Sequence, residues 1–301
     1  MATIKQFFSS FFSVEPQERL KLLLLSVTYA CIIGSYTITK DLRDTVFLST
    51  VGAEYQPIAQ MVAWVVFIIP LFLYAKLVDT LRRYQLLFGL ALFYGLIGLA
   101  FAYFLSDASI GLLNTQQSVY RLFGWFFYFF IEGYLPFVVG AFWAFTNSIS
   151  NQEAAKKNYG LLAAGSKIGG MATALFAMFV LSPKSAHHTI LNDIFSHQIL
   201  LLVASVLSLC VPCIVYLLIK RVPSSYLHGY EAAYKVEKDR IKKGENATGI
   251  WAGLNMLIRY PYVLGMFGIL FFDEIMSRII GFQRIWVAKT QSTSLVDLSM
   301  F

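Results

Sequence analysis

The sequence predicts an all-α polytopic membrane protein, and three observations lead to this class. Hydrophobic residues make up 57% of the 301 residues and charged residues only 14%, whereas soluble domains are about 45–50% apolar and about 25% charged. The apolar residues form runs long enough for a membrane-spanning helix, which needs about 20 residues. Lys and Arg gather in alternate connections between these runs, as they do in proteins threaded through a bilayer.

Seven candidate spans follow one another along the chain. Their approximate limits are Leu20–Leu48, Pro57–Leu77, Gln85–Leu105, Val119–Ser148, Tyr159–Leu181, Gln198–Ile219 and Tyr262–Ala288. The fourth contains Pro136, which has no N–H to donate to the carbonyl of Glu132, and a kink is therefore predicted there. Gly165 and Gly169 in the fifth span predict the close approach of a neighbouring helix.

The net charge of +7 indicates an orientation, because the cations are unevenly placed. They precede the first span, follow the second and the fourth, and number seven within residues 220–243. These connections alternate, so the sequence predicts that they are cytoplasmic, together with the N-terminus, in a bacterial inner membrane. The basic charge is then a topology signal in contact with the lipid bilayer, and no nucleic-acid surface is expected.

The domain organisation follows from the long polar segment after the sixth span. Residues 1–219 are predicted to form a six-helix bundle like that of major-facilitator carriers, and residues 220–250 a basic cytoplasmic linker. Residues 251–301 would begin a second bundle with one helix, the remainder being truncated. Two bundles joined by a linker are the plan of many secondary carriers, so a separate second-half polypeptide or a homodimer is expected to complete the molecule.

Ionisable residues inside spans are costly and are therefore candidates for function. Lys40 and Arg43 are three residues apart and share a helical face. They could clamp a phosphate, or they could form a self-neutralising cluster at the membrane surface with Asp41 and Asp44. Both interpretations stay open at this stage.

Three further positions carry charge into the spans. Glu132 lies beside the predicted kink and could bind substrate, couple a proton, or pair with Lys167 or Arg121. Lys167 lies within the fifth span and needs a carboxylate or an anionic ligand. In the seventh span, next to Asp273, Glu274 and Arg278 have the i, i+4 spacing of an ion pair, which is as compatible with a structural role as with a site.

No cofactor, metal centre or catalytic set is expected, so the sequence predicts that the protein is not an enzyme. The C-x-x-C pair Cys210 and Cys213 lies in an apolar run, with no second cysteine pair nearby. His187, His188 and His197 are assigned to one outer loop, where an ordinary solvated role is favoured over metal binding.

Several segments resemble the ATP/ADP translocase family of plastids and intracellular bacteria. Arg43-Asp-Thr-Val-Phe-Leu-Ser-Thr-Val-Gly-Ala-Glu54 is similar to the family's K-D-T-[LV]-x-x-[TS]-x-x-G-A-E signature, and Phe142-Trp-Ala-Phe-Thr-Asn147 to its F-W-x-[FL]-x-N. Lys156-Lys-Asn-Tyr-Gly160 is similar to its K-R-F-Y-G, and Phe271-Phe-Asp-Glu274 to its N-[LIV]-x-E. The resemblance covers residues 15–290.

The resemblance implies a carrier that exchanges ATP and ADP or takes up nucleotides by alternating access. The residues expected to bind substrate are Lys40, Arg43, Glu132, Asn147, Lys167 and Glu274. Asp44, Asp273 and Arg278 are expected to have coupling or structural roles. The alternatives are a proton-coupled carrier of another phosphorylated or organic anion, and a truncated membrane protein that transports nothing.

Overall fold

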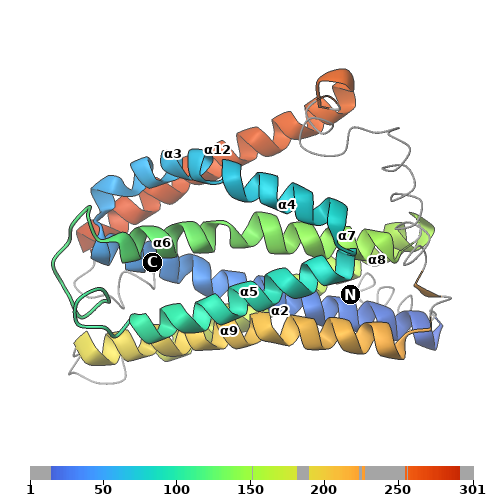
Figure 1. Ribbon diagram of the computed structural model, residues 1–301, viewed down its shortest axis with the longest axis horizontal. Coiled ribbons are helices and arrows are strands. Elements are labelled where there is room, and N and C mark those ends of the chain that lie inside the picture. Colours follow the sequence, from blue (N-terminus) through green and yellow to red (C-terminus); the bar gives the residue numbers. More distant parts are fainter. Residues whose placement is uncertain are drawn as a thin grey trace, which may run out of the picture.

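The computed structural model is a bundle of long helices that lie side by side (Figure 1). It describes residues 15–150, 152–181, 190–223, 226–227, 255 and 257–291, and these residues contain no strand. Within them, five helices are long and apolar enough to cross a membrane, and one bent helix pair brings the number to as many as six. The chain is therefore an all-α polytopic membrane protein.

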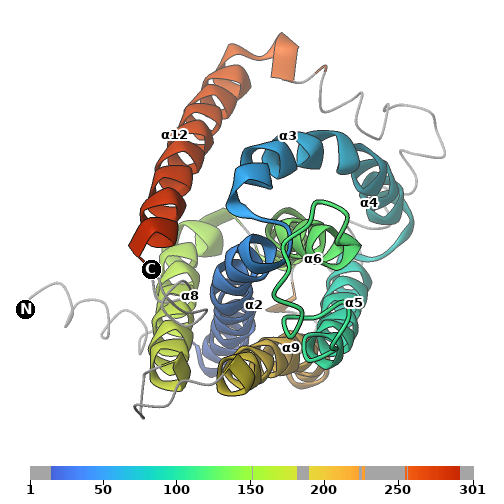
Figure 2. The ribbon, with the colours of Figure 1, turned by 90° about the vertical axis from the view of Figure 1, so that its left-hand side faces the viewer.

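The elements follow the predicted runs in chain order. They are α2 (Pro16–Thr50), η1 (Ala53–Tyr55), α3 (Gln56–Val66), α4 (Ile68–Thr80), α5 (Arg83–Phe104), α6 (Leu122–Glu132), η2 (Leu135–Val139), α7 (Gly140–Ser148), α8 (Gln152–Leu181), α9 (Ile190–Arg221) and α12 (Pro261–Gln291). Seen end-on, α2 packs against α8, α9 and α6, and α5 packs against α9 (Figure 2). α3 and α4 lie outside α6, and α12 lies beside α3 and α8 (Figure 2).

Two of the predicted spans are interrupted. The second is the pair α3 and α4, which are bent by 40° where they meet at Phe67. The fourth is broken as Pro136 predicts, because α6 ends at Glu132 and a π-helical turn, η2, precedes α7. A π-turn within a helix often marks a functional position, and this one follows directly after the predicted site residue.

The last two long helices differ from the prediction in detail. α9 begins at Ile190 rather than near Gln198, so His197 lies inside the helix and is fully buried. Its assignment to a solvated loop was wrong, and His187 and His188 lie outside the described residues. α12 confirms a helix in the seventh run, but it is not among the helices that meet the length and hydropathy criteria for a span. That α12 crosses the membrane stays a prediction.

Small residues bring α2 and α8 into close contact. A β-carbon added to Gly169 would lie 2.5 Å from the carbonyl oxygen of Ala30, and one added to Gly165 would lie 3.0 Å from Cβ of Ser26. One turn further along, a β-carbon on Gly34 would lie 2.8 Å from Thr173. The predicted packing role of the two α8 glycines is confirmed, since backbones can approach this closely only where side chains are small.

The connection between α5 and α6 is organised around Arg121. Its guanidinium donates to four backbone carbonyl groups at 2.5–3.1 Å, those of Ile110, Gly111, Asn114 and Gln116. In the same connection, hydrogen bonds from the side chain of Ser109 and from backbone N–H groups lower the pKa of the Asp107 carboxyl. This segment is therefore fixed by its own polar groups.

Lys21, near the start of the first predicted span, is held by hydrogen bonds. It is only 2% exposed, and its ammonium group donates to the carbonyl oxygens of Tyr226 at 3.0 Å and Ile149 at 3.4 Å. The Tyr226 hydroxyl in turn donates to Glu15 at 2.6 Å. The N-terminal end of α2 thus holds the chain where it leaves α7 and again after it leaves α9.

The close contact of α2 and α8 predicts that alanine substitutions at two glycines of α8 change the thermal unfolding temperature differently. Gly169→Ala should lower the thermal unfolding temperature in detergent, because the added methyl group meets the backbone of α2 and overpacking costs about 1–3 kcal/mol. Gly160→Ala should leave it unchanged or raise it, since no atom lies within 4 Å and alanine favours helix by about 1 kcal/mol. Equal unfolding temperatures for the two variants would contradict this packing.

Candidate functional site

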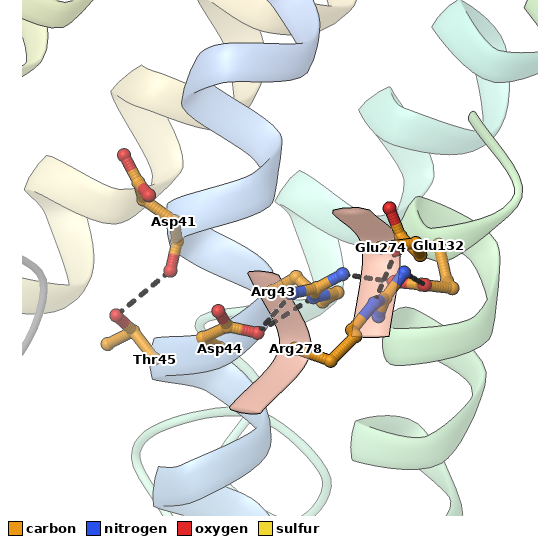
Figure 3. Close-up of polar contacts among 7 residues, drawn as sticks. All are labelled: Asp41, Arg43, Asp44, Thr45, Glu132, Glu274 and Arg278. Atoms are coloured by element: carbon orange, nitrogen blue, oxygen red, sulfur yellow. Dashed lines mark hydrogen bonds and ion pairs between the residues drawn. The ribbon is translucent and has the colours of Figure 1, made fainter. Parts of the chain in front are cut away.

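Five charged side chains from three helices converge at one point (Figure 3). The ion cluster, as these residues are called below, consists of Arg43, Asp44, Glu132, Glu274 and Arg278. Arg43 and Asp44 come from α2, Glu132 from the last turn of α6, and Glu274 and Arg278 from α12. Residues far apart in sequence therefore meet at one point of the fold.

The carboxylate of Glu132 is shared by two guanidinium groups. Nη1 of Arg43 donates to its Oε2 atom, and Nη2 of Arg278 donates to its Oε1 atom at 2.5 Å. Each oxygen thus has its own arginine, one from α2 and one from α12. Charge-assisted hydrogen bonds of this kind are about twice as strong as neutral ones, so Glu132 links the two helices through α6.

Each arginine has a second acidic partner on its own helix. Nε and Nη2 of Arg43 both lie 2.7 Å from Oδ1 of Asp44, and Nε of Arg278 lies 2.6 Å from Oε1 of Glu274. The i, i+4 pair predicted in the seventh run is thereby confirmed. The guanidinium carbon of Arg43 also lies 5.0 Å from the centre of the Tyr128 ring, within cation–π distance.

Burial falls steadily across the ion cluster. The exposed fraction of the side chain is 8% for Arg43 and 12% for Glu132, but 38% for Arg278 and 56% for Glu274. Charges buried within apolar helices are stable only when they are paired, so the inner half of the cluster depends on its own ion pairs. The outer half, on α12, is open to exchange its partners.

The charges of the ion cluster nearly cancel. Two arginines face the three carboxylates of Asp44, Glu132 and Glu274, which leaves a net charge of −1 (two minus three). Both guanidinium groups are thus paired with carboxylates, and Glu132 is the member of the cluster that contacts both arginines.

The structure does not bring the other predicted site residues into the ion cluster. Lys40 on α2, Lys167 on α8 and Asp273 on α12 are exposed, and none of them forms a described ion pair with the cluster. Asn147 lies near the end of α7 and accepts a hydrogen bond from the Tyr159 hydroxyl. The roles predicted for these residues stay predictions.

The partners suggested for Glu132 from the sequence are wrong. Arg121 binds backbone carbonyl groups in the connection before α6. Lys167 is exposed on α8, whereas the partners of Glu132 are Arg43 and Arg278. Arg43 is buried while Lys40 is exposed, and Arg43 shares the Glu132 carboxylate with Arg278 of α12. The phosphate clamp of Lys40 and Arg43 stays a prediction.

Two tyrosines near the ion cluster were not predicted from the sequence. Tyr128 lies four residues before Glu132 and stacks below the Arg43 guanidinium. Tyr36 lies seven residues before Arg43 on α2, and its phenol group lies within electrostatic range of both arginines and of Glu132 and Glu274. Their helical spacing from the charged residues was the available signal.

The remaining signature segments have structural roles. Gly52 follows α2 with a φ angle of +115°, which residues other than glycine rarely adopt. It connects α2 to η1. Trp143 of one segment packs edge-on against Tyr159 of another, with ring centres 5.2 Å apart. The hydrogen bond between Tyr159 and Asn147 joins the same two segments.

The fold and the ion cluster define a polytopic membrane protein with paired charges between its helices, and charged residues within membrane spans are candidates for solute or ion pathways. A model of the TLC ATP/ADP transporter family matches residues 1–280, and the chain belongs to this family.

One curated relative is ADP,ATP carrier protein 5 of Rickettsia typhi, which is 24% identical over 259 residues. The match covers 78% of this chain and 51% of the relative, so the chain spans about half the length of that protein. No solved structure matches the chain.

The ion cluster predicts unequal effects for its acidic members. Glu132→Gln should lower the thermal unfolding temperature strongly, because breaking a buried pair costs about 3–5 kcal/mol. Glu274→Gln, at the exposed end, should change stability by no more than about 1 kcal/mol. Both variants remove one negative charge, so similar unfolding temperatures would contradict the burial gradient.

Proposed function

We propose that the protein is a membrane carrier for nucleotides, with ATP and ADP as its first candidate substrates, working by alternating access. The observation that carries this proposal is the sharing of Glu132 by Arg43 and Arg278. Two guanidinium groups held about one carboxylate can hold a phosphate in its place, since arginine binds carboxylate and phosphate with the same bidentate geometry.

The positions of the two arginines, on helices before and after residue 220, support transport by alternating access. Arg43 belongs to the helices before residue 220, and Arg278 belongs to the helix after it. Carriers of this plan bind their substrate between two halves that rock against each other. A phosphate bound by both arginines would connect the halves as Glu132 does in this structure, and its release would let them separate.

The comparisons support the same proposal. The chain belongs to a family described as ATP/ADP transporters, and its relative in Rickettsia typhi is described as an ADP,ATP carrier. By this proposal the membrane is a bacterial inner membrane with the N-terminus in the cytoplasm. Residues 1–219, 220–250 and 251–301 would be the first bundle, the linker and the start of a second bundle.

Uptake of labelled ATP, ADP and NAD by bacterial cells that express the protein tests the proposal. We expect entry of at least one nucleotide, and its efflux when unlabelled nucleotide is added outside. Arg43→Gln and Arg278→Gln should each reduce uptake at least tenfold, because each removes one side of the phosphate clamp. Lys76→Gln removes a positive charge at an exposed position of α4 and should leave uptake unchanged.

Failure of every nucleotide to enter would count decisively against the carrier and would favour a membrane protein that transports nothing.

A proton-coupled carrier of a phosphorylated or organic anion is the second candidate, and the position of Glu132 favours it. When an anion takes both arginines, the displaced carboxylate is left in an apolar setting, where the protonated form is favoured. Binding of the anion would then bring a proton with it.

In proteoliposomes, a pH gradient should drive uptake without internal nucleotide if this candidate is right, and Glu132→Gln should remove the dependence on the gradient. Uptake that requires internal nucleotide and ignores pH supports exchange instead.

A further inference from the structure

Tyr36 and Arg43 leave α2 on nearly the same face. Tyr36 lies seven positions before Arg43. Seven residues of α-helix fall about 20° short of two full turns, so the two side chains leave α2 on nearly the same face. The rise between them is about 10.5 Å. A nucleoside diphosphate, extended from base to terminal phosphate, spans a comparable length.

The environment of the Tyr36 ring suits stacking. The ring is partly exposed, and it lies nearly parallel to the ring of Tyr134, with centres 6.2 Å apart and an angle of 13° between the planes. Tyr134 is buried and is held in turn by Tyr94, whose ring is 5.0 Å away and edge-on. Tyr36 is therefore supported from the bundle interior and presents part of its surface outward.

The phenol group also lies within the field of the ion cluster. The charges of Arg43, Glu132, Glu274 and Arg278 all act on the Tyr36 hydroxyl. A ligand that lies along this face of α2 with its phosphates at the two arginines would therefore reach this ring. Tyr29, one further heptad step away on α2, differs because its ring is already covered by Phe142 at 4.5 Å and Trp143 at 5.4 Å.

We propose that Tyr36 is the base-stacking residue of this site and that the nucleotide lies along α2, with its phosphates at Arg43 and Arg278. The inference rests on the proposed nucleotide carrier and adds the position and direction of the bound molecule. Stacking on an aromatic ring is tolerant of base identity, because every base has a π face. Tyr36 accordingly selects nucleotides over simple phosphates and does not distinguish adenine from other bases.

Binding of ADP and of inorganic pyrophosphate to the purified protein in lipid nanodiscs separates the base from the phosphates. Tyr36→Leu should weaken ADP binding about five- to 150-fold, the range that stacking on one base supports, and should leave pyrophosphate binding unchanged. Tyr36→Phe keeps the ring and should bind ADP within about twofold of the original protein. Arg43→Gln should weaken the binding of both ligands.

Tyr29→Leu is the matched control, because it removes a ring from the same face of α2 about 21 Å from Arg43 by helical rise. It should leave the ratio of ADP to pyrophosphate affinity unchanged, even if the variant is less stable. Equal losses of ADP and pyrophosphate binding in Tyr36→Leu, or no loss of either, would overturn the stacking role. If the original protein binds neither ligand, the proposed function fails instead, so the two failures are distinguishable.

Discussion

The arrangement of the helices around the site depends on the two ion pairs of the Glu132 carboxylate. This carboxylate is the meeting point of α2, α6 and α12, because Arg43 and Arg278 each bind one of its oxygens. Each partner is separated from Glu132 by a long stretch of chain, 89 residues for Arg43 and 146 for Arg278. Charges in an apolar layer must be neutralised, so their ion pairs fix how these helices face one another.

The local structure around Glu132 fits this position. α6 ends at Glu132 and the π-helical turn containing Pro136 follows, so the carboxylate lies at a break in the span rather than within a regular helix. α2, by contrast, runs without a break over 35 residues, Pro16–Thr50, and includes both Tyr36 and Arg43. One long helix can therefore carry an aromatic ring and a cation at a fixed separation, which is the requirement for binding a molecule with a flat apolar end and a charged end.

Much of the fold follows from local sequence patterns. Hydrophobic runs of about 20 residues predict the spans, Pro136 predicts the break after Glu132, and Gly165 with Gly169 predicts the close contact of α8 with another helix. The pair Glu274–Arg278 was also predictable, because a spacing of four residues places both side chains on one face of a helix. Each of these features depends only on residues close together in the chain.

The contacts between helices could not be obtained in the same way. The sequence marks Glu132 and Arg43 as costly charges, but the rotation of each helix decides which charges meet, and this depends on packing along the whole bundle. The same reason explains why Lys21 and His197, which read as polar residues near span ends, are buried. Their hydrogen bonds to backbone carbonyl groups, Lys21 to Ile149 and Tyr226 and His197 to Asp193, become visible only in the folded chain.

The guanidinium of Arg121, surrounded by the carbonyl oxygens of the connection between α5 and α6, has a wider consequence. Backbone carbonyl oxygens are also among the ligands by which protein loops hold calcium. Here the cation is covalently part of the loop, so it cannot be removed by a chelator or lost by dilution. The hydrogen bonds of Arg121 are therefore expected to persist whatever the divalent ion content of the surroundings.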